Sequence, residues 1–354
     1  MALSRRWFIA SLPAACFGQS GAKGRVLPSA IQKYPDPATE FPVQRLTDPA
    51  HTSILSGARA ISKHGFLVSA SDFSGRYEAY RIDLKSGHQK QLTDAADLDP
   101  HSITLTPDDR GIVYLDGSSV MTANLGSLRT REVYKVQDGK AHGLGLAGDG
   151  QYAVLVEPNG LKLLNMTKGS AETLAEGREE ISDPMPRPKR ASVLYRKAGS
   201  LWLANYDAKQ NYRLRLSEGG IGPALWSPDG GSLFYISYPP EGAHKLHSLH
   251  EFVPDSNEDR TIADTSQFVC VGCNGDASVF AGASGSKASP YVLLLVRAVK
   301  RELTLCEHRA SDPAMVSPVF SPNSQRVFFG SDRHGKPAIY SLAVEKLVEE
   351  TETA

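Results

Sequence analysis

Six side chains in this sequence could bind an acidic ligand or help to move a proton. They are His51, Arg59, His101, His142, Arg187 and His308. An imidazole changes its charge near neutral pH and also binds metals, while a guanidinium group matches the two oxygens of a carboxylate. Each of the six lies beside a segment predicted to be a strand. We therefore treat them as candidate ligand-binding residues at the mouth of a channel, with a structural or simply exposed position as the alternative for each.

Two further patterns resemble parts of metal sites. His244, His247 and His250 recur every three residues, but on an extended strand this spacing turns the middle ring to the opposite face. We expect these histidines to face solvent at the edge of a sheet. Cys270 and Cys273 have the spacing of half a zinc site, but the chain has no second cysteine pair to complete four ligands. We favour burial of this pair over a disulfide, and the sequence predicts no metal site.

Motifs for nucleotide binding and nucleophilic hydrolysis are not supported. GLGLAG, at 143–148, has the spelling of a dinucleotide-binding loop, but it leads into a predicted strand instead of a helix. The sequence contains no P-loop, no HExxH and no GxSxG. No residue can be named as a catalytic nucleophile or base.

Composition narrows the class of protein. The 354 residues include 39 Lys and Arg against 39 Asp and Glu, for a formal net charge of +0, and 41% of them are hydrophobic. A nucleic-acid protein needs an excess of positive charge. A chain of this composition can bury a large core in water, so we expect a globular protein that binds no nucleic acid and does not span a membrane.

The N-terminus has the layout of an export signal. Arg5 and Arg6 precede an apolar stretch at 7–15, which is far shorter than the roughly 20 residues of a membrane-spanning helix. We assign 1–24 to this signal, with the twin-arginine route favoured over general secretion. The mature protein is then expected in the periplasm or outside the cell. Lipidation at Cys16 remains a less favoured alternative.

One phrase recurs along the chain: an apolar pair, a small residue, an acidic or amide turn, and a β-rich run. Clear copies are LTPDDRGIVYL, LAGDGQYAVLV, LWSPDGGSLFYI and VFSPNSQRVFFG. The turn positions of all seven copies are His64, Asp108, Asp149, Lys189, Asp229, Asn274 and Asn323. An Asp or Asn beside Gly suits a tight hairpin turn, and the flanking Val, Ile, Phe and Tyr suit strands. Each copy is therefore predicted to be a strand, a turn and a strand.

The repeat predicts an all-β, seven-bladed β-propeller. In the first repeat, 78–84 and 88–92 provide a third and a fourth strand, and four strands in about 40 residues form a propeller blade. The last repeat lacks its fourth strand, but PVQRLTD near the N-terminus echoes QKQLTD of the first repeat. We predict that this N-terminal strand completes the last blade. The propeller is placed at 38–349, after a linker at 25–37 and before a tail at 350–354.

The proline-rich segment SDPMPRPKR, at 182–190, is expected to differ from the other copies. Proline donates no hydrogen bond to a sheet and is rare in central strands. We expect this segment to form an exposed connection before the fourth blade.

The repeats also carry a family resemblance. SDFSGRYEAYRIDLKSGHQKQLTD, LWSPDGGSLFYIS and FSPNSQRVFFGSDRHGKPAIYSL resemble the propeller repeats of the periplasmic TolB-type proteins and of the oligogalacturonate lyases. The opening VQRLTDP, followed by His51, leans toward the lyases. That resemblance implies β-elimination of pectin-derived oligogalacturonate, assisted by a divalent metal such as manganese that histidines hold at the mouth of the ring.

Most histidines that the resemblance implies are replaced. The lyases carry them just ahead of the repeated turn, in phrases resembling HEFWSPDG and HxHPxFSPDG. The corresponding positions here are Pro223, Gln267, Phe268, Met315 and Ser317. His308 alone stands where the family keeps a histidine, and one imidazole does not hold a catalytic metal.

The sequence therefore favours a diverged propeller that binds an acidic, uronate-containing oligosaccharide or a protein partner, without a cofactor. An active, manganese-dependent oligogalacturonate lyase is one alternative, and a TolB-like protein of envelope assembly is the other. If the protein is an enzyme, it is expected to be a polysaccharide lyase.

Overall fold

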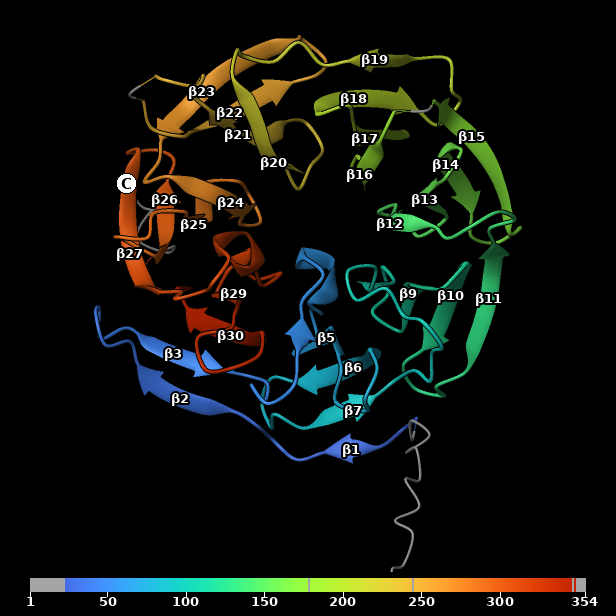
Figure 1. Ribbon diagram of the computed structural model, residues 1–354, viewed down its shortest axis with the longest axis horizontal. Helices are drawn as coiled ribbons and strands as arrows, with labels where there is room; N and C mark the ends of the chain where they lie inside the picture. Colours follow the sequence, from blue (N-terminus) through green and yellow to red (C-terminus); the bar gives the residue numbers. More distant parts are fainter. Residues whose placement is uncertain (1–22, 178, 244, 346, 348–354) are drawn as a thin grey trace, which may run out of the picture.

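Seven sheets form a closed ring around a central channel (Figure 1). The computed structural model describes residues 23–177, 179–243, 245–345 and 347. Five of the sheets have four strands and two have five. The predicted seven-bladed β-propeller is confirmed.

The blades are numbered in chain order, and their strands are given from the channel outward. Blade 1 contains β4 (Ser53–Ile54), β5 (Phe66–Ser71), β6 (Glu78–Asp83), β7 (Gln89–Gln91) and β1 (Val26–Leu27). Blade 2 contains β8 (Thr104–Leu105), β9 (Gly111–Asp116), β10 (Ser119–Asn124) and β11 (Thr130–Lys135). Blade 3 contains β12 (His142–Leu146), β13 (Tyr152–Glu157), β14 (Gly160–Asn165) and β15 (Ser170–Glu176). Blade 4 contains β16 (Ile181–Pro186), β17 (Ser192–Lys197), β18 (Ser200–Asn205) and β19 (Asn211–Arg213).

Blades 5 to 7 complete the ring. Blade 5 contains β20 (Gly220–Trp226), β21 (Leu233–Tyr238), β22 (Ser248–Val253) and β23 (Glu258–Asp264). Blade 6 contains β24 (Phe268–Cys273), β25 (Val279–Ser284), β26 (Tyr291–Val296) and β27 (Arg301–Glu307). Blade 7 contains β28 (Val319–Phe320), β29 (Arg326–Ser331), β30 (Ala338–Ala343), β3 (Pro42–Arg45) and β2 (Gln32–Pro35). Two short 3₁₀ helices, η1 (Ala58–Ala60) and η2 (Pro313–Val316), lie near the channel.

All seven predicted turn positions fall between the first and second strands of their blades. In the clearest copies of the repeat, hydrogen bonds of the turn side chain explain why an Asp stands at the turn position. An oxygen of Asp229 accepts hydrogen bonds from the Ser227 hydroxyl at 2.6 Å and from the Gly231 N–H at 2.9 Å. Asp108 accepts the equivalent pair from Thr106 and Arg110. The carboxylate thus satisfies donors that the tight turn leaves without a backbone partner.

Both ends of the chain contribute to one sheet. β3 pairs with β30, with Val43 opposite Leu342, and β2 pairs with the outer side of β3. The segment 25–37, expected as a linker, instead forms β1 on the outside of blade 1 and β2 on the outside of blade 7. Figure 1 shows these blue strands along the outer edge of the two blades. The N-terminal segment therefore ties the first and last blades together.

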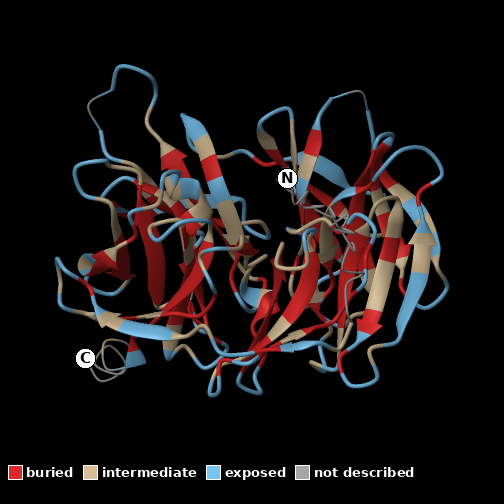
Figure 2. Cartoon of the chain, turned by 60° about the horizontal axis from the view of Figure 1, so that its bottom comes forward, coloured by how far each residue is buried: buried red, intermediate tan, exposed pale blue. Residues whose placement is uncertain are grey.

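The core lies between the faces of adjacent blades. Every residue of β5 and of β25 is buried, because each sheet is covered on both sides by its neighbours in the ring. One apolar cluster joins blades 6 and 7 through residues such as Leu294 and Phe329. Figure 2 shows the buried residues within the sheets and the exposed residues at their rims. This packing holds the inner strands in place around the channel.

The expectation that the segment 182–190 forms an exposed connection before the fourth blade is wrong. The segment begins within β16, the innermost strand of blade 4, and is not an exposed connection. An innermost strand is a sheet edge, so one side of its backbone needs no partner strand and proline is tolerated there. Pro186 accordingly pairs with Val193 on the other side.

Two expectations about the ends fall mainly outside the structure. The leader at 1–24 overlaps the described residues only at Lys23 and Gly24, and the tail at 350–354 lies outside them. Within the described part of the chain, no helix is long and apolar enough to cross a bilayer.

Candidate functional site

A cavity of about 1040 Å³ lies in the channel, and residues from all seven blades or the links before them line it. We call it the central pocket. The inner strands β12, β16, β20, β24 and β28 provide most of its wall. Blades 1 and 2 contribute the segment 56–58 and His101.

The wall is mainly apolar and aromatic. Trp226, Tyr238 and Phe320 line it, together with several aliphatic side chains and prolines. Tyr238 can lie there because its neighbour is Gly222, where a Cβ would stand 2.8 Å from the tyrosine ring. Such flat surfaces suit the apolar faces of a ring-shaped ligand.

A backbone irregularity places one acid at the pocket. The pairing of β16 with β17 shifts between Ser182 and Met185, and Asp183 within this bulge has φ of 52°. Bulges commonly change the direction of a side chain. The carboxylate of Asp183 remains 64% exposed, so it is accessible to a ligand in the pocket.

Arg196 is the partner of Asp183, but its other donors are already occupied. Its Nε lies 3.4 Å from an Asp183 oxygen. Its terminal nitrogens donate to the carbonyl groups of Gly199, Ile221 and Gly222 at 2.9 to 3.3 Å. The guanidinium group therefore joins blades 4 and 5 and has little capacity left for a ligand carboxylate.

Other polar side chains that line the pocket include His101, Ser317 and Cys273. His101 is exposed, and its backbone N–H donates to the Asp99 side chain at 2.9 Å. Ser317 ends η2 with φ of 35° and occupies a position where the family resemblance places a metal-binding histidine. Burial raises the pKa of the Cys273 thiol to about 12. That thiol is therefore protonated at neutral pH and is a poor metal ligand.

These residues do not fit the manganese site that the resemblance implies. Manganese prefers carboxylate, carbonyl, water and imidazole ligands, several of them converging on one point. The described part of the chain holds no group of three or more His, Cys, Asp or Glu side chains that could bind a metal ion together. In the central pocket, His101 and Asp183 are the two lining residues of suitable chemistry.

The six predicted site residues do not converge. His101 lines the central pocket. His51 lines a different cavity, where its ring lies 4.6 Å from that of Phe73 and its Nδ1 lies 3.6 Å from Asp72. His142 is exposed at the start of β12, with Nε2 3.3 Å from the Ile181 carbonyl oxygen.

Arg59 and Arg187 hold blades together. Arg59 donates to the carbonyl oxygens of Leu146 and Ala147 at 2.8 and 3.0 Å, and burial lowers its pKa. Arg187 is 6% exposed and donates through Nε to the Gly230 carbonyl oxygen at 2.6 Å. Its other contacts are an ion pair with Asp255 at 3.1 Å and the face of the Trp226 ring.

His308 has a structural environment as well. It is fully buried, and its Nε2 lies 3.0 Å from the Ser284 carbonyl oxygen. Its Nδ1 accepts a hydrogen bond from the Ala310 N–H at 3.1 Å. Burial lowers the pKa of this imidazole, which favours the neutral tautomer that both contacts require.

The solvent-facing position expected for the histidines of AHKLHSLHEF is wrong for His250, whereas the expectation for the cysteine pair holds. His250 is 7% exposed, contrary to the expected solvent-facing position, and His247 Nδ1 lies 2.9 Å from the Phe268 carbonyl oxygen. His244 lies outside the described residues. Cys270 and Cys273 are free thiols, buried and half-buried, which confirms the expected burial over a disulfide.

His250 belongs to a polar network on blade 5. Its Nε2 lies 3.0 Å from the Ser248 hydroxyl and 3.3 Å from that of Thr261, and its Nδ1 lies 3.3 Å from Asp259. Asp259 also accepts hydrogen bonds from Tyr235 and from Ser217. Because Ser217 belongs to the link between blades 4 and 5, the network fixes the position of that link.

Sequence reasoning missed the residues that give the central pocket its character. Trp226 and Tyr238 are not among the six predicted site residues, and Asp183 lies in the segment that was expected to form an exposed connection. One sequence signal could have pointed to Trp226. It comes directly before the turn in LWSPDG, and the residue at this place ends an inner strand, next to the channel, in every clear repeat.

Comparison with known proteins supports the resemblance seen in the repeats. No known protein-family profile matches the chain. The oligogalacturonide lyase of Pectobacterium atrosepticum is 22% identical over 381 residues, covering 91% of this chain and 98% of the relative. The oligogalacturonate lyase of Dickeya dadantii is 21% identical over 383 residues, with the same coverage.

A solved structure described as oligogalacturonate lyase in complex with manganese superimposes with a TM-score of 0.84 at 22% identity. The match covers 91% of this chain and 98% of that one. The predicted similarity to oligogalacturonate lyases is thus confirmed, and the propeller architecture extends over the whole of the match.

Proposed function

We propose that this protein is a diverged relative of the oligogalacturonate lyases that binds an oligosaccharide in its central pocket and does not cleave it by metal-assisted elimination. The observation that carries the proposal is the lining of that pocket. It combines a cavity of about 1040 Å³ with an aromatic wall, while the described side chains that line this cavity do not form a manganese site.

The lining suits a sugar. Tyr238 is half-buried and offers a surface on which the apolar face of a pyranose ring can stack, whereas Trp226 is 8% exposed and has Arg187 against one face. Asp183 accepts hydrogen bonds from sugar hydroxyl groups, and the exposed imidazole of His101 either donates or accepts them. At about 1040 Å³, the cavity lies just above the upper end of the usual range for ligand pockets, which is roughly 300 to 1,000 Å³.

Charge indicates which sugars bind best. Arg196 is the one Lys or Arg among the described residues that line the pocket, and Asp183 and three carbonyl groups occupy it. A ligand carboxylate would approach the exposed carboxylate of Asp183 without a free cation to offset the repulsion. The pocket therefore favours an uncharged or methyl-esterified oligosaccharide over a free polyuronate.

Export of the chain is part of the proposal. The arginine pair and apolar stretch within 1–24 are typical of a bacterial export signal. An exported propeller would meet saccharides in the periplasm or outside the cell.

Titration calorimetry with the mature protein tests the binding role. The ligands are an oligogalacturonate, its methyl ester and an uncharged galactose oligosaccharide of equal length. We expect the uncharged ligands to bind, and Tyr238→Ala to weaken them about tenfold through lost stacking. Tyr212→Ala is the matched control, because Tyr212 is 41% exposed on the outer strand β19. The proposal fails if none of the three ligands binds, or if both substitutions have the same effect.

An active lyase is the second candidate function. Its support is the match over 91% of this chain and 98% of the P. atrosepticum enzyme, which shows that the whole scaffold is shared. Manganese-dependent release of unsaturated product from oligogalacturonate would establish this candidate.

A further inference from the structure

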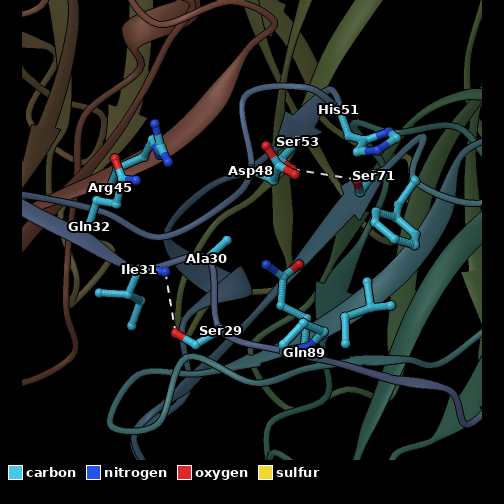
Figure 3. Close-up of a pocket in the computed structure, with 13 residues that line it drawn as sticks. Ser29, Ala30, Ile31, Gln32, Arg45, Asp48, His51, Ser53, Ser71 and Gln89 are labelled. Carbon is cyan, nitrogen blue, oxygen red and sulfur yellow. Dashed lines mark hydrogen bonds between the residues drawn. The ribbon is translucent and has the colours of Figure 1, made fainter.

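A second cavity, of about 380 Å³, lies where the N-terminal segment passes from blade 1 to blade 7 (Figure 3). We call it the peripheral cavity. The segment 27–32 forms one part of its lining, and the other lining residues that matter here are Arg45, Asp48, Phe73 and Gln89. Figure 3 shows Arg45 and Gln32 on one side and His51 and Ser71 on the other. None of these residues lines the central pocket.

Arg45 is the unusual member of this lining. It is 9% exposed, and its Nε is buried without a hydrogen-bond partner among the described residues. A buried N–H group without a partner is costly, because neither water nor protein replaces its lost hydration. Asp36, which is fully buried, pairs with Arg333 at 3.5 Å and not with Arg45.

The repeat provides an internal comparison. Arg45 pairs with Tyr340 in blade 7, as Gln91 pairs with Tyr80 in blade 1. The Gln91 amide nitrogen donates to the Thr93 carbonyl oxygen at 2.9 Å, and its amide oxygen lies 3.5 Å from the Tyr80 hydroxyl. A neutral side chain therefore satisfies this position within the fold. The cation in blade 7 is not required by the blade itself.

The other groups around the cavity define what would complement Arg45. Arg25 lies 5.4 Å from the ring of Phe73, which adds a second positive charge nearby. Gln32, Gln89, Ser53 and Ser71 supply hydrogen-bonding groups. The exposed carboxylate of Asp48 also lines the cavity, and it would repel a second anionic group but accept a hydrogen bond from a hydroxyl.

We propose that the peripheral cavity binds a small hydroxy-carboxylate anion. The carboxylate of the ligand neutralises Arg45, and its hydroxyl groups bond to Asp48 and to the side-chain amides. Because the segment 27–31 forms part of the wall, ligand binding would also strengthen the attachment of the N-terminal segment to the ring.

Calorimetry and thermal unfolding of the mature protein test this site with four probes. Gluconate carries a carboxylate and hydroxyl groups, sorbitol carries hydroxyl groups alone, acetate carries a carboxylate alone, and inorganic phosphate is a different anion. We expect gluconate to bind and to raise the melting temperature, and the other three to do so at least about tenfold more weakly, because each lacks part of the complementary set. Equal binding of sorbitol, or tighter binding of phosphate, would overturn the proposal.

Two substitutions test whether gluconate binds in the peripheral cavity. Arg45→Gln copies the residue of blade 1 and should weaken gluconate about tenfold to a hundredfold while leaving the unliganded protein as stable as before, or more stable. Ala30→Trp should block the cavity from the N-terminal segment and abolish gluconate binding. Lys33→Gln removes an exposed charge from β2, the strand that pairs with the Arg45 strand β3; it is the control and should bind gluconate normally.

Gluconate binding that survives both Arg45→Gln and Ala30→Trp would place the ligand elsewhere and refute the assignment. Saccharide binding at the central pocket should be the same in all three variants. Failure of this site is therefore distinguishable from failure of the proposed function.

Discussion

The Nε atom of Arg196 lies 3.4 Å from a carboxylate oxygen of Asp183 in the wall of the central pocket. The two residues belong to adjacent strands of blade 4, and the guanidinium group also bonds to two carbonyl groups of blade 5. Arg196 thus contacts both an acid in the wall of the pocket and the backbone of the next blade, blade 5. Asp183 is exposed and Arg196 is largely enclosed, with side-chain exposures of 64% and 21%.

Asp183→Asn should change ligand preference with little effect on folding. An exposed ion pair contributes less than about 1 kcal/mol, and Asn tolerates the positive φ of this position about as well as Asp. Loss of the negative charge should strengthen binding of free oligogalacturonate relative to its methyl ester, as measured by calorimetry. Asp183→Val is the contrasting variant and should reduce the free energy of unfolding by about 1 to 2 kcal/mol, because a β-branched residue is strained at this φ. An unchanged preference in the Asn variant would contradict this account of the pocket.

His101→Ala and His308→Ala should separate ligand binding from stability. His101 is exposed at the central pocket, so its loss should weaken saccharide binding and leave the unfolding free energy within about 0.5 kcal/mol. Removing His308 leaves the Ser284 carbonyl group and the Ala310 N–H without their partner, which should cost about 1 to 3 kcal/mol. Denaturant unfolding and calorimetry on both variants check this pair. The reverse pattern would show that His308 acts at a ligand site.

Asp259 should make the stability of the protein depend on acidic pH. Burial alone would raise the pKa of its carboxyl group, but hydrogen bonds from His250, Tyr235 and Ser217 outweigh burial and lower it to about 2. The unfolded value is 3.8, so the contribution is complete above about pH 4 and is lost as the pH falls toward 2. It amounts to about 2 kcal/mol. The unfolding free energy of the wild type should therefore fall more steeply than that of Asp259→Asn between pH 4 and 2, and parallel curves would contradict the shift.

Arg187→Lys should destabilise the fold even though the charge is kept. The guanidinium group reaches the Gly230 carbonyl oxygen and Asp255 at the same time and lies against Trp226, whereas an ammonium group cannot make this planar set of contacts. We expect the unfolding free energy to fall by about 1 to 3 kcal/mol. Lys189→Arg, at an exposed position of the same turn, is the control and should unfold as the wild type does.

The ring could be predicted from the sequence because its repeat combines a turn with strands on both sides. Asp229 illustrates why: the same carboxylate that marks the turn in the sequence satisfies two donors within it. These interactions are local, so their signal survives without knowledge of the tertiary structure. The strand β3 was found for the same reason, through the likeness of PVQRLTD to QKQLTD.

The site was less predictable because it depends on contacts between blades and on backbone irregularities. Asp183 lies beside prolines that suggest a loop, and no sequence pattern indicates the bulge that brings it to the central pocket. Arg187 and His308 have residue types that bind ligands, but their positions within the ring give them carbonyl partners from other strands. Such long-range pairing is decided by packing rather than by spacing along the chain.

The most direct test of the central claim is the ultraviolet absorbance of unsaturated product when the purified mature protein is mixed with oligogalacturonate and manganese. The account predicts no increase above a protein-free control, because the described residues beside the central pocket do not form a site for the metal. Turnover that requires manganese and is lost on chelation would show that the protein is a working lyase and contradict the claim.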